Sequence, residues 1–294
     1  MHNSVIAFLL IIISYTSIYG QNISNSEYYL PTNILKFANY LYENNEYQRA
    51  VAEYERYLFS TQGNQDSIHF KIGLCYYLNN QFTKSESKFA QFSQLNPNSR
   101  FVADVFFYLA YINYKLKKYK VSTGYISRLQ NNHDNSHVIV EKTQLLRIAN
   151  QLHLRNWTHA EKSLKSISPT SNFLTSKNVL SNYLTEGRQL KSKNKYVAVA
   201  LSAILPGAGK IYVGKPIDGL FSFVLFSLTT WQSYDGFSEN NIKSTKGWIF
   251  ASIGTAFYLG NIYGSAVAAK IYNQEINHAF DTKISIELSK AFGH

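Results

Sequence analysis

Apolar residues follow a helical period through much of the chain, and in the first half they also repeat over a longer distance. Four segments share one order, in which an aromatic residue is followed three positions later by a small residue and four positions after that by a bulky apolar residue. This spacing puts the three side chains on one face of a helix. The aromatic residue recurs after 35, 37 and 38 residues, which predicts a helical repeat. The four triplets are Tyr47, Ala50 and Tyr54; Phe82, Ser85 and Phe89; Tyr119, Ser122 and Ile126; and Trp157, Ala160 and Leu164.

Each repeat is predicted to be a hairpin of two helices. Another small residue, Ala38, Gly73 or Ala110, stands twelve positions before the small residue of the first three triplets. Small residues on both helices let the two axes cross closely, and the bulky residue fills the adjoining groove. We expect about four repeats over residues 31–172. The fourth fits only with a turn one residue shorter, which places four residues on its core face: Leu145, Ile148, Ala149 and Leu152.

These triplets resemble the tetratricopeptide repeat (TPR) family over about half of the chain. The resemblance implies an all-α, TPR-like antiparallel helix-hairpin solenoid whose groove, lined by the first helix of each repeat, holds a protein or peptide. The three tyrosines at one groove-facing position, Tyr42, Tyr77 and Tyr114, either recognise a partner, for which their rigid amphipathic rings are suited, or pack between adjacent repeats. Counting along the first helices assigns Asn39, Leu74 and Tyr111 to one groove-facing position and Tyr42, Tyr77 and Tyr114 to the next.

The composition changes after residue 195. An apolar stretch over 196–206 leads into a glycine-rich break over 206–219, and two long apolar stretches follow at about 217–234 and 247–269. Only Asp218 is charged in the first of them, and the second has no charged residue. Because a helix needs about 20 apolar residues to cross a bilayer, the pattern predicts a transmembrane helical hairpin. Two buried helices of a water-soluble domain are the alternative interpretation.

Glycine and aromatic residues interrupt this C-terminal segment in a recognisable order. They include a G-x-G-x-x-Y-x-G core, and two later glycines have the G-x-x-x-G spacing of closely packed helices. The segment resembles the C-terminal part of bacterial TPR membrane proteins, and its core is similar to the TM2-type two-helix domain. The resemblance implies a membrane hairpin and no particular activity. The motif residues are Pro206, Gly207, Gly209, Tyr212, Gly214, Gly219, Gly260, Asn261, Tyr263 and Gly264.

The N-terminus has the pattern of an export signal. Residues 5–13 are uninterruptedly apolar, which is too short to span a bilayer and typical of a signal-peptide core. Small and polar residues follow, and cleavage is expected after Gly20. An uncleaved anchor extending to Tyr19 is the alternative.

The net charge of +11 is spread along the chain, with +7 over residues 21–190 and +4 over 191–294. Neither part has a dense basic run or a nucleic-acid motif, so we expect no nucleic-acid partner and a basic surface that contacts solvent or anionic lipid. Residues 209–215 fit the start of a phosphate-binding loop, but Pro216 replaces its serine or threonine. We expect no catalytic residue, no cofactor and no metal, and hence no enzyme.

These observations predict an envelope scaffold that mediates protein–protein interaction. Its parts are a signal peptide (1–20), a repeat domain with a trailing helix (21–190), a membrane module (191–274) and a polar tail (275–294). The expected partners are a protein or peptide and membrane lipid, and the repeat domain is expected in the periplasm, anchored to a membrane. The alternative is an accessory factor for membrane protein assembly or transport that acts through the C-terminal module.

Overall fold

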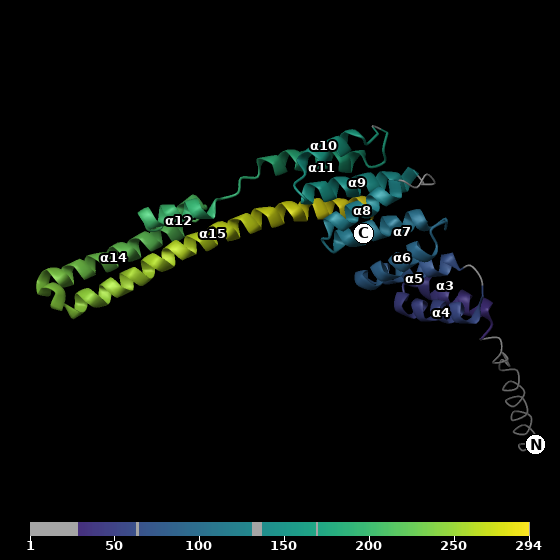
Figure 1. The fold of residues 1–294 in the computed structure, drawn as a ribbon, viewed down its shortest axis with the longest axis horizontal. Helices are drawn as coiled ribbons and strands as arrows, with labels where there is room; N and C mark the ends of the chain where they lie inside the picture. Colours follow the sequence, from purple (N-terminus) through teal and green to yellow (C-terminus); the bar gives the residue numbers. More distant parts are fainter. Residues whose placement is uncertain (1–28, 63–64, 131–136, 169, 294) are drawn as a thin grey trace, which may run out of the picture. The chain divides into compact units, whose positions relative to one another are not determined.

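The computed structural model describes residues 29–62, 65–130, 137–168 and 170–293. Every element in this part of the chain is a helix (Figure 1). The chain divides into two compact units, Met1–Asn150 and Gln151–His294, whereas the repeat domain is predicted from the sequence to extend to residue 190. The predicted signal peptide lies outside the described residues. The helices of the first half are α3 (Pro31–Glu43), α4 (Tyr47–Ser60), α5 (Asp66–Leu78), α6 (Phe82–Leu95), α7 (Val102–Lys115), α8 (Tyr119–Gln130) and α9 (His137–His153).

The first unit consists of helix hairpins in the predicted repeat. The packed pairs are α3 with α4, α5 with α6, and α7 with α8, and α4–α5 and α6–α7 also pack between successive hairpins. The four predicted aromatic residues are each the first residue of a helix, Tyr47 of α4, Phe82 of α6, Tyr119 of α8 and Trp157 of α10 (Trp157–Lys165). The repeating pattern therefore marks where the second helix of each hairpin begins.

The small residues of the first three triplets lie where the sequence places them, on the second helix of a packed pair. Ala50, Ser85, Ser122 and Ala160 are fully buried. In the second hairpin, the Ser85 hydroxyl donates to the Gly73 carbonyl at 2.8 Å. A Cβ atom on Gly73 would lie 2.5 Å from the Phe89 ring, so the bulky residue of the triplet occupies the space that glycine leaves. The helix-crossing interpretation is confirmed.

The turn inside each hairpin is the same in all four repeats. A residue with positive φ stands two positions before the aromatic residue, and it is Asn45, Asn80, Lys117 or Arg155. The N–H of the next residue donates to the carbonyl five positions back, as in Glu46 to Leu41 and Asn156 to Gln151. This is the Schellman pattern, which satisfies the last carbonyls of the first helix.

The fourth turn is therefore not one residue shorter, and that prediction is wrong. With an unchanged turn, Ile148 stands where the other repeats have Ala38, Gly73 and Ala110, nine positions before the aromatic residue. The predicted core face is confirmed, since Leu145, Ile148, Ala149 and Leu152 are fully buried.

The crossing predicts the effect of enlarging a small residue. Ala50→Trp should lower the free energy of unfolding by about 1–3 kcal/mol, because a bulky side chain overpacks the fully buried contact between α3 and α4. Urea unfolding followed by circular dichroism measures the change. Ala52→Trp on the exposed face of the same helix is the control and should leave the midpoint almost unchanged. Equal effects of the two substitutions would contradict this account of the crossing.

The second unit contains the long C-terminal helices. Its elements after α10 are α11 (Leu174–Gln189), α12 (Lys195–Ile204), α13 (Ala208–Tyr212), α14 (Pro216–Asn240), the 3₁₀ turn η1 (Asn241–Lys243) and α15 (Thr245–Phe292). In Figure 1, α14 runs beside the first part of α15 and forms a hairpin with it through η1, and α12 lies beside the same helix.

No helix in the described part of the chain is both long enough and apolar enough to cross a membrane. This corrects the prediction of a transmembrane hairpin. The reason lies in the composition, because α14 carries Asp218 and Asp235, and the uncharged stretch of α15 contains Asn261 among many serine, threonine, tyrosine and glycine residues.

Two smaller expectations about this unit also change. The predicted polar tail belongs to α15, which continues to Phe292 with buried residues at every fourth position, Phe280, Ile284, Leu288 and Phe292. Gly260, the first glycine of the G-x-x-x-G pair, makes no close contact with another helix, because a Cβ there would meet nothing within 4 Å. The close approach of α14 to α15 occurs instead at Gly236, where a Cβ would lie 2.6 Å from the Gly247 nitrogen.

Candidate functional site

The predicted groove of the repeat unit is partly filled by its own tyrosines. Tyr77, Tyr111 and Tyr114 are buried. The Tyr77 ring lies 6.2 Å from Tyr111, whose ring stacks on Tyr114 at 6.2 Å. Tyr108 joins them 5.0 Å from Tyr77, and burial raises its pKa to about 12. Of the six predicted groove residues, Tyr77 and Tyr111 therefore lie in the packing between repeats, and Tyr114 packs within the third repeat against Tyr111 and Tyr119.

The other three predicted groove residues are half-buried. The Asn39 side-chain oxygen accepts from the Tyr54 hydroxyl at 2.8 Å and from the Lys71 ammonium at 2.7 Å, so it links the first repeat to the second. The Lys71 ammonium also lies 5.8 Å from the Tyr42 ring centre. Leu74 is half-buried on α5. The accessible groove residues are thus Asn39 and Tyr42 of the first repeat and Leu74 of the second. Lys71 of the second repeat lies beside them.

The glycine-rich break lets two backbone segments touch. Gly207 has φ +91°, and a Cβ there would lie 2.0 Å from the Gly219 carbonyl oxygen. A Cβ on Gly209 would lie 2.0 Å from the Ala198 carbonyl oxygen, which only glycine permits. Pro206, Gly207, Gly209 and Gly219 are all buried. The break therefore folds α12, α13 and the start of α14 against one another.

The remaining motif residues differ in their surroundings. Gly214 has φ +85° and faces open space, and Gly264 lies against the Lys210 side chain. Asn261 is buried, and neither polar atom of its side chain has a hydrogen-bond partner in the described structure. One turn further on, the Ser265 hydroxyl lies 2.6 Å from that of Ser202, which in turn accepts from the Gly209 N–H.

Large apolar side chains are exposed along the α14–α15 hairpin. Ile217 is 82 % exposed, and Ile204, at the end of α12, is 84 % exposed. Globular proteins rarely expose contiguous apolar patches of this kind unless they contact a protein or a membrane. Other exposed members are Leu220, Phe221, Phe223, Val224, Leu228 and Trp231 on α14, and Trp248, Ile249, Ile253, Phe257 and Leu259 on α15.

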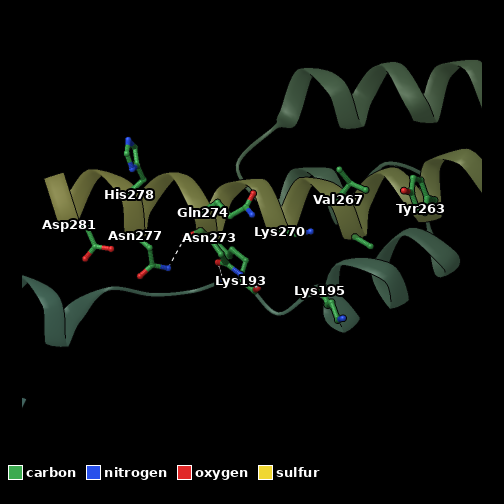
Figure 2. Close-up of a pocket in the computed structure, with 11 residues that line it drawn as sticks. Lys193, Lys195, Tyr263, Val267, Lys270, Asn273, Gln274, Asn277, His278 and Asp281 are labelled. Atoms are coloured by element: carbon green, nitrogen blue, oxygen red, sulfur yellow. Dashed lines mark hydrogen bonds between the residues drawn. The ribbon is translucent and has the colours of Figure 1, made fainter. Parts of the chain in front are cut away.

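A cleft of about 900 Å³ opens between the start of α12 and the middle of α15 (Figure 2). Three lysines line it, Lys193 and Lys195 from the chain at the start of α12 and Lys270 from α15. Tyr263 of the glycine motif is at the other end from Asp281 in Figure 2. The other lining residues are Ala266, Val267, Asn273, Gln274, Asn277, His278 and Asp281.

A reciprocal pair of hydrogen bonds positions the lysine-bearing segment. The Asn273 side chain accepts from the Lys193 N–H at 2.7 Å and donates to the Lys193 carbonyl at 2.8 Å. Tyr212 adds a second attachment, because its hydroxyl accepts from the Asn194 N–H and its ring centre lies 4.7 Å from the Lys193 ammonium. Lys193 is thus held by its backbone and its side chain.

The one carboxylate lining the cleft is already compensated. Asp281 lies 2.8 Å from an Arg155 guanidinium nitrogen and 3.0 Å from His153 Nδ1. Burial by itself raises the pKa of the Asp281 carboxyl, but the hydrogen bonds from His153 and Arg155 outweigh it and hold this pKa below its usual value. The carboxylate stays charged and paired, so it does not neutralise the lysines.

Sequence reasoning missed this cleft. Lys193 and Lys195 are close together in the sequence, but Lys270 and Asn273 are far from them along the chain and lie at the end of an apolar stretch. The available signal was the lysine that ends the uncharged run of α15, with asparagines three and seven positions later.

Residues 68–99 match the tetratricopeptide repeat family. The matched span covers nearly all of α5 and all of α6, the hairpin that contains Gly73, Ser85 and Phe89. Comparison with curated proteins and with solved structures gave no match.

Proposed function

We propose that this chain is a protein-interaction scaffold whose repeat unit holds a protein or peptide and whose C-terminal hairpin attaches it to a lipid surface of the cell envelope. The observation that carries the first part is the TPR match over residues 68–99, set among hairpins with the same crossing and the same turn. TPR units commonly bind protein or peptide partners along their first helices.

The accessible groove residues support a particular kind of partner. Leu74 offers apolar area, Tyr42 an amphipathic ring and Asn39 an amide, with the Lys71 ammonium between them. Such a surface suits an extended segment with an apolar side chain flanked by an acidic or polar one. Binding energy in interfaces concentrates in a few central residues, and Leu74 on the matched repeat is our choice for one of them.

Attachment to lipid is supported by the exposed apolar side chains of the α14–α15 hairpin. In this proposal the hairpin lies in the interface of a membrane, and neither helix crosses it. An apolar face beside lysines is the usual composition of helices that bind in this way. The export signal expected over residues 1–20 would place the repeat unit outside the cytoplasm.

We expect Leu74→Arg to reduce capture of the partner by roughly 30-fold, the loss that corresponds to a hot-spot contact. The full-length chain would be used to isolate crosslinked partners from native envelope extract, and each partner would then be titrated against purified variants. Leu95→Arg is the matched control, since Leu95 is an exposed leucine at the end of α6. If the Leu74→Arg chain stays helical and binds the same partners with unchanged affinity, the groove is not the binding surface.

The exposed hairpin also favours a second candidate, an accessory factor for membrane protein assembly or transport that acts through this hairpin. Replacing the whole second unit, Gln151–His294, with an unrelated lipid anchor separates the two. A scaffold keeps its function after the exchange, and an accessory factor of this kind loses it.

A further inference from the structure

The lysine-lined cleft carries an uncompensated positive charge. No ion pair of Lys193, Lys195 or Lys270 occurs among the residues that the structure describes. Asp281, the acidic residue among those that line the cleft, is paired with Arg155 and His153. Three lysines therefore line one opening, and none of them forms an ion pair with a described residue.

The donors around this opening suit a phosphate group. Lys195 and Lys270 are exposed, and Gln274, whose amide is also exposed, stands on the same helix as Lys270 (Figure 2). Lysine ammonium and amide N–H groups are donors that phosphate oxygens accept. Asn273 fixes the backbone of Lys193, so part of the site is already ordered.

Apolar surface begins where the charged cleft ends. Tyr196 follows Lys195 directly and is 70 % exposed, and Tyr263, which lines the cleft, is also largely exposed. Further along the same elements are the exposed Ile204 of α12 and Leu259 of α15. A soluble anion would use the lysines alone, whereas a lipid has both a phosphate headgroup and acyl chains.

We propose that the cleft of Lys193, Lys195 and Lys270 binds the phosphate headgroups of anionic lipids while the adjoining apolar side chains enter the same leaflet. This inference rests on the proposed lipid attachment and names the lipid class that it selects. Each lysine near an anionic surface contributes a free energy that corresponds to roughly a fivefold gain in affinity, and the gain declines as salt screens the charges.

The test is flotation of the full-length chain with vesicles of two compositions, phosphatidylcholine alone and an equal mixture of phosphatidylcholine and phosphatidylglycerol. The wild-type chain should bind the mixed vesicles more tightly and lose that preference at high salt. The double variant Lys195→Gln, Lys270→Gln should bind the mixed vesicles roughly 30-fold more weakly. Lys193 is left unchanged because its ammonium packs over Tyr212.

The matched control is Lys36→Gln, Lys120→Gln, which removes the same charge from exposed lysines of α3 and α8 and should cost far less. Circular dichroism confirms that each variant is helical.

Equal binding of wild type to both vesicles, or no loss in the double variant, overturns the headgroup site and leaves lipid attachment intact. Binding to neither vesicle overturns both. Binding of inorganic phosphate without vesicles, weakened in the double variant alone, assigns the cleft to a soluble anion and overturns the lipid assignment.

Discussion

Gly207→Ala should lower the stability of the C-terminal unit by about 2–6 kcal/mol, because it combines two separate costs. The residue has φ +91°, and holding a side chain in such a conformation costs about 1–3 kcal/mol. The new methyl group would also lie 2.0 Å from the Gly219 carbonyl oxygen, and overpacking of this kind costs about 1–3 kcal/mol. Thermal unfolding of the full chain, followed by the fluorescence of Trp157, Trp231 and Trp248, which all lie in the second unit, measures the loss.

Gly214→Ala is the matched control for this substitution. Gly214 has φ +85° but nothing within 4 Å of a Cβ, so only the backbone cost of about 1–3 kcal/mol applies. If both variants lose the same stability, the contact between residues 207 and 219 contributes nothing and the close approach of α13 to α14 is not what requires glycine.

The second large effect is expected in the repeat unit. Phe89→Ala should cost about 3–5 kcal/mol in the free energy of unfolding, the usual range for removing a fully buried aromatic side chain. The Phe89 ring stacks on Tyr108 at 5.5 Å and lies 5.8 Å from Phe70, so the cavity would open between two successive repeats. Urea unfolding of the full chain measures this loss.

Leu95→Ala provides the comparison within the same helix. Leu95 is 68 % exposed, and its truncation should change the unfolding free energy by less than about 0.5 kcal/mol. A small effect of Phe89→Ala would show that neighbouring aromatic side chains close the cavity, and the packing account of the second hairpin would then fail.

The repeat could be predicted because its physical requirements are local. A close helix crossing needs a small residue, and the residue seven positions after the helix start fills the groove beside it, so Ala50 with Tyr54 and Ser85 with Phe89 identify the hairpins directly. The length of the fourth turn could not be predicted because Ile148 stands where the other three repeats have alanine or glycine. The size of the residue at this position therefore does not indicate how many residues the following turn contains.

The surroundings of the groove tyrosines and the lysine cleft could not be predicted from the local sequence. Counting positions on a first helix cannot separate a side chain that faces a partner from one that faces the next repeat, and Tyr77, Tyr111 and Tyr114 are in the packing. The cleft depends on pairing Lys193 with Asn273, 80 residues away. Hydropathy likewise predicted two apolar stretches, but it could not show that the last uncharged stretch continues as one helix to Phe292.

The unbroken course of α15 has a structural consequence. Its 48 residues make a rod of about 72 Å with no proline to act as a hinge. The first part of this rod packs against α14, its middle holds the lysine segment through Asn273, and its last part carries Asp281 in the bond to Arg155. One uninterrupted helix axis therefore connects the hairpin contact, the lysine segment and the Asp281 ion pair within the second unit.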